Sequence, residues 1–259
     1  MLRSGSDLRG LTIRATDGDI GKVDEFLFDD VSWTIRYMVV NTGGWLLKEL
    51  VLLSPRSIKA VAWDERGVEV NLTRQQVENA PDISADQPVS RQMEEELAKY
   101  YDYQPYWYGP GLWGAAGIPF GVGAGYTAAA MAAVEREREP QEAPRGDPHL
   151  RSTREVKGYR IHASDGEIGH VADFLMDDET WSIRYLVVDT GGWLPGKQVL
   201  IAPLWAREVS WDEQAVTVDL TRDQVKEAPE YDPQRLRRED EQLLHSHYRR
   251  TGYWEDPMR

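Results

Sequence analysis

An internal repeat constrains the fold of this chain more than any other feature of its sequence. Residues 10–81 align without a gap with residues 158–229, at a spacing of 148 residues. The run Trp-Thr-Ile-Arg-Tyr at 33–37 returns as Trp-Ser-Ile-Arg-Tyr at 181–185, and Thr-Gly-Gly-Trp-Leu at 42–46 returns at 190–194. A weaker match, displaced by one residue, continues through 97–107 and 244–254. Two copies separated by a long spacer indicate a tandem duplication rather than a solenoid.

Within each repeat the periodicity is that of short β-strands. Between Trp33 and Val39 large apolar residues alternate with smaller or polar ones, which is typical of a half-buried strand. Asp17-Gly18 lies between two candidate strands, and Asp-Gly favours the positive φ angles of a tight hairpin turn. The pattern predicts five or six short antiparallel strands in each unit. Closing such a sheet into a small barrel hides the strand edges.

A helical tail is predicted after each barrel. Thr73 and Thr221 are suited to capping a short helical turn. Apolar residues then recur every four positions over 89–101, behind a candidate cap at Ser90 and acids in the early turns. A less regular stripe covers 236–248. The predicted domains are therefore 5–107 for the first barrel with its tail and 151–254 for the second.

The spacer at 108–150 is rich in glycine, alanine and proline and predicts a linker. The segment 103–134, which overlaps it, carries no charged residue and is long enough to cross a membrane. Glycines and prolines interrupt this segment before residue 127 and disfavour a helix there. A linker is the favoured interpretation, and contact with a membrane is the alternative.

Composition excludes several functions. The chain has 259 residues with 44 acids, 30 bases and no cysteine, for a formal net charge of −14. Such a charge repels phosphate backbones, so nucleic acid is not expected as a partner. The absence of cysteine excludes disulfides, thiol nucleophiles, cysteine-ligated zinc and iron–sulfur clusters. We expect a cytoplasmic protein, since the first ten residues also lack the apolar core of a signal peptide.

No catalytic, cofactor or metal site is predicted. The five histidines lack the Glu-x-x-His or His-x-x-x-His spacing of metal ligands. The acid pairs Asp29-Asp30 and Asp177-Asp178 fit either an oxygen-ligand cation site or the chemistry of turns between strands, which is the simpler explanation. We therefore expect a protein that is not an enzyme.

Four residues are candidates for contact with a partner. Trp45 and Trp193 follow the glycine pairs, and an exposed tryptophan is a common anchor of protein interfaces; alternatively, these rings plug a barrel end or pack on a tail. Arg36 and Arg184 lie opposite the apolar face of their strands. They could dock a partner, pair with an acid of a neighbouring strand or cover apolar surface with their stems.

The repeated pattern also resembles a known family. Gly10, Asp17-Gly18, Ile20-Gly21, the 33–37 run and the two valines that follow, together with their duplicates, resemble the PRC-barrel domain over 5–82 and 153–230. This domain forms the cytoplasmic part of the photosynthetic reaction-centre H subunit and the C-terminal half of a ribosome-maturation factor. The resemblance implies a mainly β fold with two six-stranded, SH3-like barrels used for docking or assembly, and it implies no catalytic residues.

The leading hypothesis is a non-enzymatic module for protein–protein assembly, whose units act on an unidentified protein partner. The units could also pair with each other as a pseudo-dimer, or with a second chain as a homodimer. One alternative is a membrane-associated accessory subunit of an electron-transfer complex, with a photosynthetic role inherited only by homology. Another is an adaptor for ribosome assembly that binds a basic protein. A pocket between the barrels, beside Trp45 or Trp193, would instead indicate a ligand-binding or enzymatic role.

Overall fold

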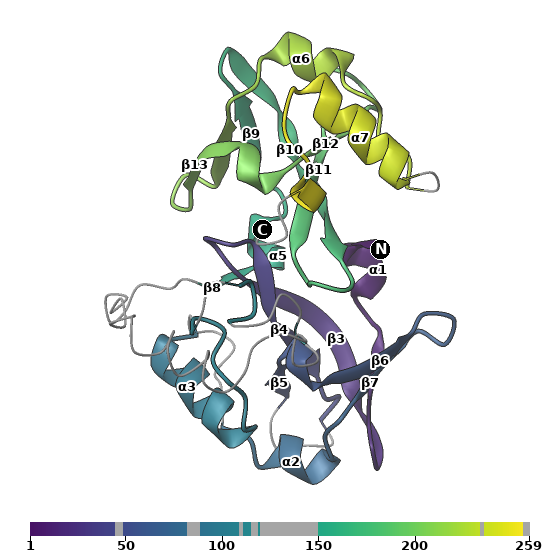
Figure 1. Cartoon of the computed structure of the whole chain (residues 1–259), viewed down its shortest axis with the longest axis vertical. Coiled ribbons are helices and arrows are strands. Elements are labelled where there is room, and N and C mark those ends of the chain that lie inside the picture. Colours follow the sequence, from purple (N-terminus) through teal and green to yellow (C-terminus); the bar gives the residue numbers. More distant parts are fainter. Residues whose placement is uncertain are drawn as a thin grey trace.

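Each repeat folds into a mainly β unit, and the two units form the lower and upper halves of Figure 1. The computed structural model describes residues 1–44, 49–81, 89–108, 111–114, 119, 150–233 and 236–255. The strands of the first unit are β2 (Thr12–Ala15), β3 (Gly18–Asp29), β4 (Thr34–Asn41), β5 (Leu50–Leu53), β6 (Ile58–Ala62) and β7 (Gly67–Val70). Those of the second are β9 (Arg160–Ala163), β10 (Gly166–Asp177), β11 (Ile183–Asp189), β12 (Gln198–Ile201), β13 (Ala206–Ser210) and β14 (Ala215–Val218).

The two sheets have the same topology. The strand order is β5-β4-β3-β2-β7-β6 in the first unit and β12-β11-β10-β9-β14-β13 in the second. Neighbouring strands are antiparallel except at β2/β7 and β9/β14, which are parallel. The expectation of antiparallel strands throughout is therefore wrong at this pair. The chain reaches β7 only after four intervening strands, so no tight hairpin turn imposes an antiparallel direction on it.

A short 3₁₀ turn connects the two end strands of each sheet. In the first unit η1 (Pro55–Ser57) lies between β5 and β6, and in the second η2 (Pro203–Trp205) lies between β12 and β13. These strands end the hydrogen-bonded order of their sheets, and no ladder joins them among the described residues. Two mainly β units are thus present as open sheets, and their closure into barrels stays a prediction.

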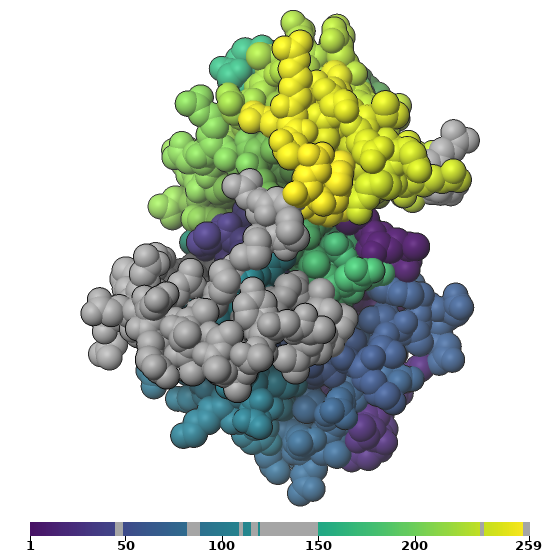
Figure 2. All heavy atoms as spheres, in the orientation of Figure 1, coloured from purple at the N-terminus to yellow at the C-terminus, as the bar shows by residue number. Residues whose placement is uncertain are grey.

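A seventh strand in each sheet comes from the other unit. The first unit contributes β1 (Leu2–Ser4), which pairs antiparallel with β10, and the second contributes β8 (Leu150–Ser152), which pairs antiparallel with β3. A one-turn helix follows each strand: α1 (Gly5–Leu8) and α5 (Thr153–Val156). We call residues 2–8 and 150–156 the arms. In Figure 2 the purple N-terminal residues lie against the green second unit.

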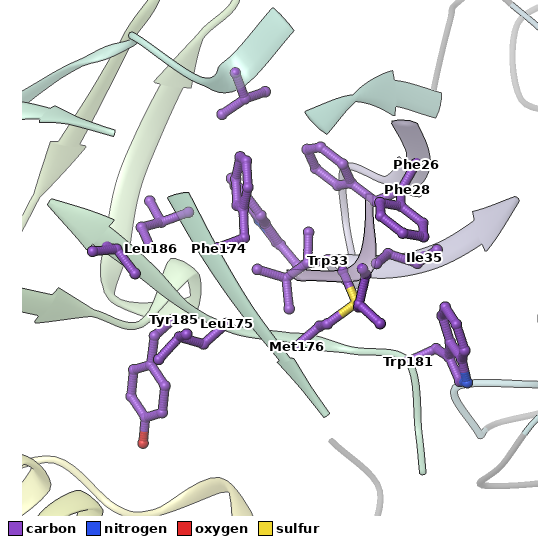
Figure 3. Packing of buried hydrophobic residues seen from close by; sticks show 14 of the residues in the cluster. Phe26, Phe28, Trp33, Ile35, Phe174, Leu175, Met176, Trp181, Tyr185 and Leu186 are labelled. Atoms are coloured by element: carbon purple, nitrogen blue, oxygen red, sulfur yellow. The ribbon is translucent and has the colours of Figure 1, made fainter. Parts of the chain in front are cut away.

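One apolar core runs through both units. Phe26 and Phe28 of β3 belong to the same buried cluster as Phe174 and Trp181 of the second unit (Figure 3). The Phe28 and Phe174 ring centroids are 6.5 Å apart, and those of Phe26 and Trp181 are 6.3 Å apart. Aromatic pairs at such separations stabilise a core beyond their buried area. The junction is therefore packed like the interior of a single domain.

Helices cover the open faces. The predicted caps are confirmed: Thr73 and Thr221 form capping boxes on α2 (Arg74–Glu78) and α6 (Arg222–Glu227). The Ser90 side chain accepts the Met93 N–H at the start of α3 (Arg91–Tyr100). The second tail helix is α7 (Arg238–His247), followed by η3 (Tyr253–Glu255).

The predicted linker is only partly described. Residues 120–149 lie outside the described residues, as do 109–110 and 115–118. In the described part of the 103–134 segment, Tyr106 and Trp113 are buried against the first unit. Within the described residues no helix combines the length and the apolar character needed to cross a bilayer.

Candidate interaction site

The two units meet through the backbones of their aromatic strands. The N–H of Ile35 donates to the carbonyl of Trp181 at 2.8 Å, and the N–H of Ile183 donates to the carbonyl of Trp33 at 2.7 Å. Buried backbone groups must be paired in this way because an unpaired one costs as much as a lost hydrogen bond. Each unit therefore completes the hydrogen bonding of the other.

Both tryptophans at this junction have left-handed backbone conformations. Trp33 has φ +52° and Trp181 has φ +60°, and both side chains are buried. Non-glycine residues rarely adopt this region, and it persists where the surroundings impose it. Here the reciprocal hydrogen bonds between the units and the shared core hold the conformation. Both tryptophans therefore belong to the shared core rather than to an exposed surface.

An arginine of each arm lies between a tryptophan and an aspartate. Arg151 Nε is 3.3 Å from Asp30 Oδ2 of the first unit, and its guanidinium lies 4.2 Å from the ring centre of Trp211 in its own unit. Arg3 repeats this arrangement with Asp178 and Trp63, at 3.2 Å and 4.0 Å. A planar guanidinium suits both contacts, since it stacks on a ring while donating to a carboxylate.

Each arm also carries a serine that binds an acid of the opposite unit. Ser4 Oγ donates to Asp173 Oδ2 at 2.5 Å, and Ser152 Oγ donates to the Glu25 carboxylate. A further ion pair joins Arg154 of the second arm to the first unit. In both arms, basic and hydroxyl groups thus face acidic groups of the strand that receives the arm.

The acid pairs identified in the sequence divide into two roles. Asp29 Oδ1 accepts two backbone N–H groups of the following turn, and Asp177 Oδ1 does the same in the second unit. This confirms the turn interpretation for the first acid of each pair. The second acid, Asp30 or Asp178, binds the arginine of an arm. Among the described residues no group of three or more His, Asp or Glu side chains is placed to hold a metal.

The helical tails bury a glutamate in each unit. In the first unit Glu94 accepts the hydroxyl of Tyr106 at 2.8 Å and lies 3.1 Å from Arg91. In the second, Glu241 accepts the hydroxyls of Tyr253 at 2.8 Å and Tyr185 at 3.1 Å. Burial raises the pKa of Glu241, and the two tyrosine hydrogen bonds oppose that rise.

Sequence analysis missed this pair of buried acids. The acids of the first tail had been interpreted only through the helix dipole. The signal was the recurrence of an Arg-x-x-Glu pair at 91–94 and 238–241, at the spacing of 147 residues that relates the two tails.

Arg36 is enclosed by the first tail. It is 4% exposed, its guanidinium lies 3.7 Å from the ring centre of Tyr106, and it donates to the carbonyl of Leu112 and to Ser32 Oγ. Burial lowers the pKa of Arg36, and Tyr106 and the acids around it oppose this. In this arrangement the side chain binds the tail of its own chain.

Arg184 is enclosed in the same way by the second tail. It is 8% exposed and lies 4.2 Å from the ring centre of Tyr253. Its Nη2 is 3.2 Å from Thr180 Oγ1 and 3.9 Å from Asp177 Oδ2. Of the alternatives left by the sequence, pairing with an acid of a neighbouring strand is the one observed here.

Of the two candidate tryptophans in the glycine loops, the structure describes only Trp193. Trp193 is partly buried against the core, and the Arg222 guanidinium lies 4.6 Å from its ring centre. Packing on its own unit is thus the arrangement found for Trp193. Trp45 lies outside the described residues.

Fold and junction together define a duplicated β-module whose copies are joined by exchanged strands. A family model of the PRC-barrel domain matches residues 2–77 and 149–225, more than half of the chain. The chain belongs to the PRC-barrel domain family. Both matched segments include an arm strand, which the resemblance over 5–82 and 153–230 left out.

One relative is similar to a short part of the chain. An "Uncharacterized protein" of Deinococcus radiodurans is 46% identical over 66 residues, which is 25% of this chain and 23% of the relative. The chain thus spans less than a quarter of that protein.

Proposed function

We propose that this chain is a non-enzymatic protein–protein assembly module in which two PRC units pair through their arms and present duplicated outer surfaces to a protein partner. The observation that carries the proposal is the reciprocal exchange of β1 and β8. Each sheet takes a strand from a separate folded unit, which is the β-augmentation mode of protein recognition. The two units become one rigid body with two related faces, and closed barrels would present those faces in the same way.

Charge supports this mode of pairing. The arms contribute Arg3, Arg151 and Arg154, and the receiving turns and strands contribute acids. Complementary charge sets the register of an interface and disfavours wrong partners. In a chain of net charge −14, the few basic groups at the junction mark the surface where an acidic unit accepts another unit.

The first experiment tests the pairing. A protease site placed in the linker after residue 135 is cleaved in the folded protein, and the products are examined by size-exclusion chromatography with light scattering. We expect the halves to elute together in low salt. Separation of the halves into two independent folded monomers under those conditions would refute a module built on paired units.

The second experiment tests the partner. The intact protein is immobilised and exposed to an extract of the cells that produce it, beside a variant carrying Arg3→Ala and Arg151→Ala. A partner that requires the paired units is retained by the first and lost from the second, and Lys59→Ala, at an exposed site outside the arms, serves as the matched control. Retention of nothing above the blank resin by either protein contradicts an assembly role. A basic ribosomal protein would support the adaptor alternative, and a membrane complex would support the accessory-subunit alternative.

A further inference from the structure

A small cavity lies between the first sheet and the first tail. Arg36, Ser54 and Arg56 line it from the sheet side, and Tyr101 and Tyr103 line it from the tail. It has room for about one atom or molecule of the size of water. Trp113 forms part of its wall and fixes the tail by donating its Nε1–H to the carbonyl of Thr180 in the second unit, at 2.7 Å.

The wall of this cavity is positively charged. Arg36 and Arg56 donate to the carbonyls of Leu112 and Trp113, and their guanidiniums lie 5.0 Å and 5.7 Å from the ring centre of Trp113. Among the described residues that line the cavity there is no carboxylate. The nearest negative charges act on Arg36 from outside the wall, and the pKa values of both arginines are lowered by burial, with Arg36 adding to the effect on Arg56. Two neighbouring cations in a buried wall favour the binding of a negatively charged group.

Two polar atoms of the same wall have no hydrogen-bond partner among the described residues. They are Nε of Arg36, whose side chain is buried, and the hydroxyl of Tyr101. A buried donor without a partner costs free energy unless a water or an ion satisfies it. A guanidinium donates and accepts no hydrogen bond, so the arginine side of the wall favours an acceptor.

The second unit differs at positions that line the cavity, Arg56 and Ala98 among them, and at the neighbouring Ser57. Leu204 replaces Arg56, Trp205 replaces Ser57 and His245 replaces Ala98, at the repeat spacings of 148 and 147 residues. The Trp205 ring lies 5.0 Å from the ring of Tyr248, the counterpart of Tyr101, and 5.1 Å from the ring of His245. Large rings therefore take the space next to the counterpart of Tyr101, and one of the two cations is lost. The Nε of Arg184 and the hydroxyl of Tyr248 are also without partners among the described residues. The features that distinguish the first unit are therefore the guanidinium of Arg56 and the space of the cavity.

We infer that the cavity of the first unit is a binding site for one small monovalent anion of the size of chloride, held by Arg36 and Arg56. The anion supplies the negative charge and the acceptor that the wall lacks. Larger anions such as sulfate and acetate do not fit a space for a single water-sized body. The bound ion ties the sheet to the tail that carries Trp113, and so stabilises the contact of that tail with the second unit. This site is independent of the proposed assembly role.

The test uses ³⁵Cl NMR line broadening, which reports chloride in slow-tumbling sites. We compare the intact protein with the variant Arg56→Leu, which introduces the leucine that the second unit carries at this position. The control variant is Lys59→Leu, which removes one positive charge from an exposed site. Saturable excess broadening is expected for the intact protein and for Lys59→Leu. Arg56→Leu is expected to weaken binding about tenfold or more, since it removes a charged donor. Bromide should compete, whereas acetate at the same ionic strength should not.

Two further measurements keep the inference decidable if Arg56→Leu does not fold. Arg56→Gln keeps a neutral hydrogen-bond donor in place of the charged one and should weaken chloride binding several-fold while circular dichroism stays unchanged. Crystals of the intact protein soaked in bromide should show an anomalous peak between the two guanidiniums. Equal broadening in all folded variants, or a bromide-free cavity that holds only water, overturns the proposal.

Discussion

Replacing Arg151 with alanine tests whether the arms hold the two units together. The side chains of Arg151 and Asp30 are 16% and 17% exposed, so solvent screens their ion pair only in part. A hydrogen bond to a charged group contributes about 1.5–3 kcal/mol. Stacking of the guanidinium on Trp211, at 4.2 Å, contributes about 0.5–2 kcal/mol. We therefore expect Arg151→Ala to lower the free energy of unfolding by about 2–5 kcal/mol.

A double-mutant cycle isolates the ion pair from the stacking. Asp30→Asn keeps the shape of the side chain, and the cycle cancels the other contacts that Asp30 makes. The interaction energy of Arg151 with Asp30 should be about 1–2 kcal/mol. The assay is equilibrium unfolding in urea followed by tryptophan fluorescence. Arg151→Lys is the control, because it retains the charge and loses the planar group that stacks on Trp211.

The outcome that refutes this reasoning is an interaction energy within error of zero, together with an Arg151→Ala variant as stable as the parent. It would mean that the arm lies on the other unit without stabilising it. The twin pair provides an internal comparison. Arg3→Ala should act in the same direction with a smaller effect, because the amino group of Met1 also binds Asp178, at 2.5 Å.

Three further predictions concern packing and pH. Gly169→Ala should lower the free energy of unfolding by more than about 3 kcal/mol, because a Cβ would overlap a backbone carbonyl of the next strand. Gly158 has open space around it, so Gly158→Ala should lower that free energy by only about 1 kcal/mol, from backbone strain. Thermal unfolding measures both changes. Burial and Glu241 raise the pKa of Tyr185 far above its ordinary value. The stability that Tyr185 contributes is therefore complete below about pH 10 and falls as the pH rises above that value. In urea unfolding at alkaline pH, Tyr185→Phe should show a smaller loss of stability with rising pH. Trp113→Phe should lose about 1 kcal/mol and increase amide exchange at 111–114, and unchanged exchange there would contradict the bridge to the second unit.

The strands and helix caps follow from local sequence, so they could be predicted. Alternation from Trp33 to Val39 identifies β4, Asp17-Gly18 identifies the turn before β3, and Thr73 is a capping residue by its chemistry. These features depend on neighbours within a few positions. The half-buried character predicted for β4 is wrong: every residue but Asn41 is buried, because the first tail and β8 cover its second face. The parallel pairing of β7 with β2 depends instead on residues more than fifty positions apart, and periodicity carries no information about it.

The exchange of arms was hidden for a different reason. Three residues are too few to show a strand period, and a single turn such as α1 has no amphipathic pattern. The repeat itself held the missing signal, since Leu-Arg-Ser occurs at 2–4 and at 150–152 with the same spacing of 148 residues that relates the two units. Nothing in that motif indicates which sheet receives it. The choice follows from Asp178 and Asp30, whose carboxylates lie across the junction from the unit that supplies each arginine.

Comparison of the two copies within one chain separates what pairing needs from what it does not. The junction keeps its chemistry in both units: the arm arginine with its Trp63 or Trp211 ring, and the carboxylate that meets it. The tail packing keeps the buried glutamate and its tyrosine in both units, whereas the cavity residue Arg56 has Leu204 as its counterpart. Pairing is reciprocal, so a change in either copy weakens both arms. Among the described residues that line the cavity none belongs to an arm, so the cavity can differ without disturbing the arms. A charged cavity in the first unit and a filled one in the second are therefore compatible with a single pseudo-symmetric scaffold. Removing the charge of the first cavity, as in Arg56→Leu, should leave arm pairing intact.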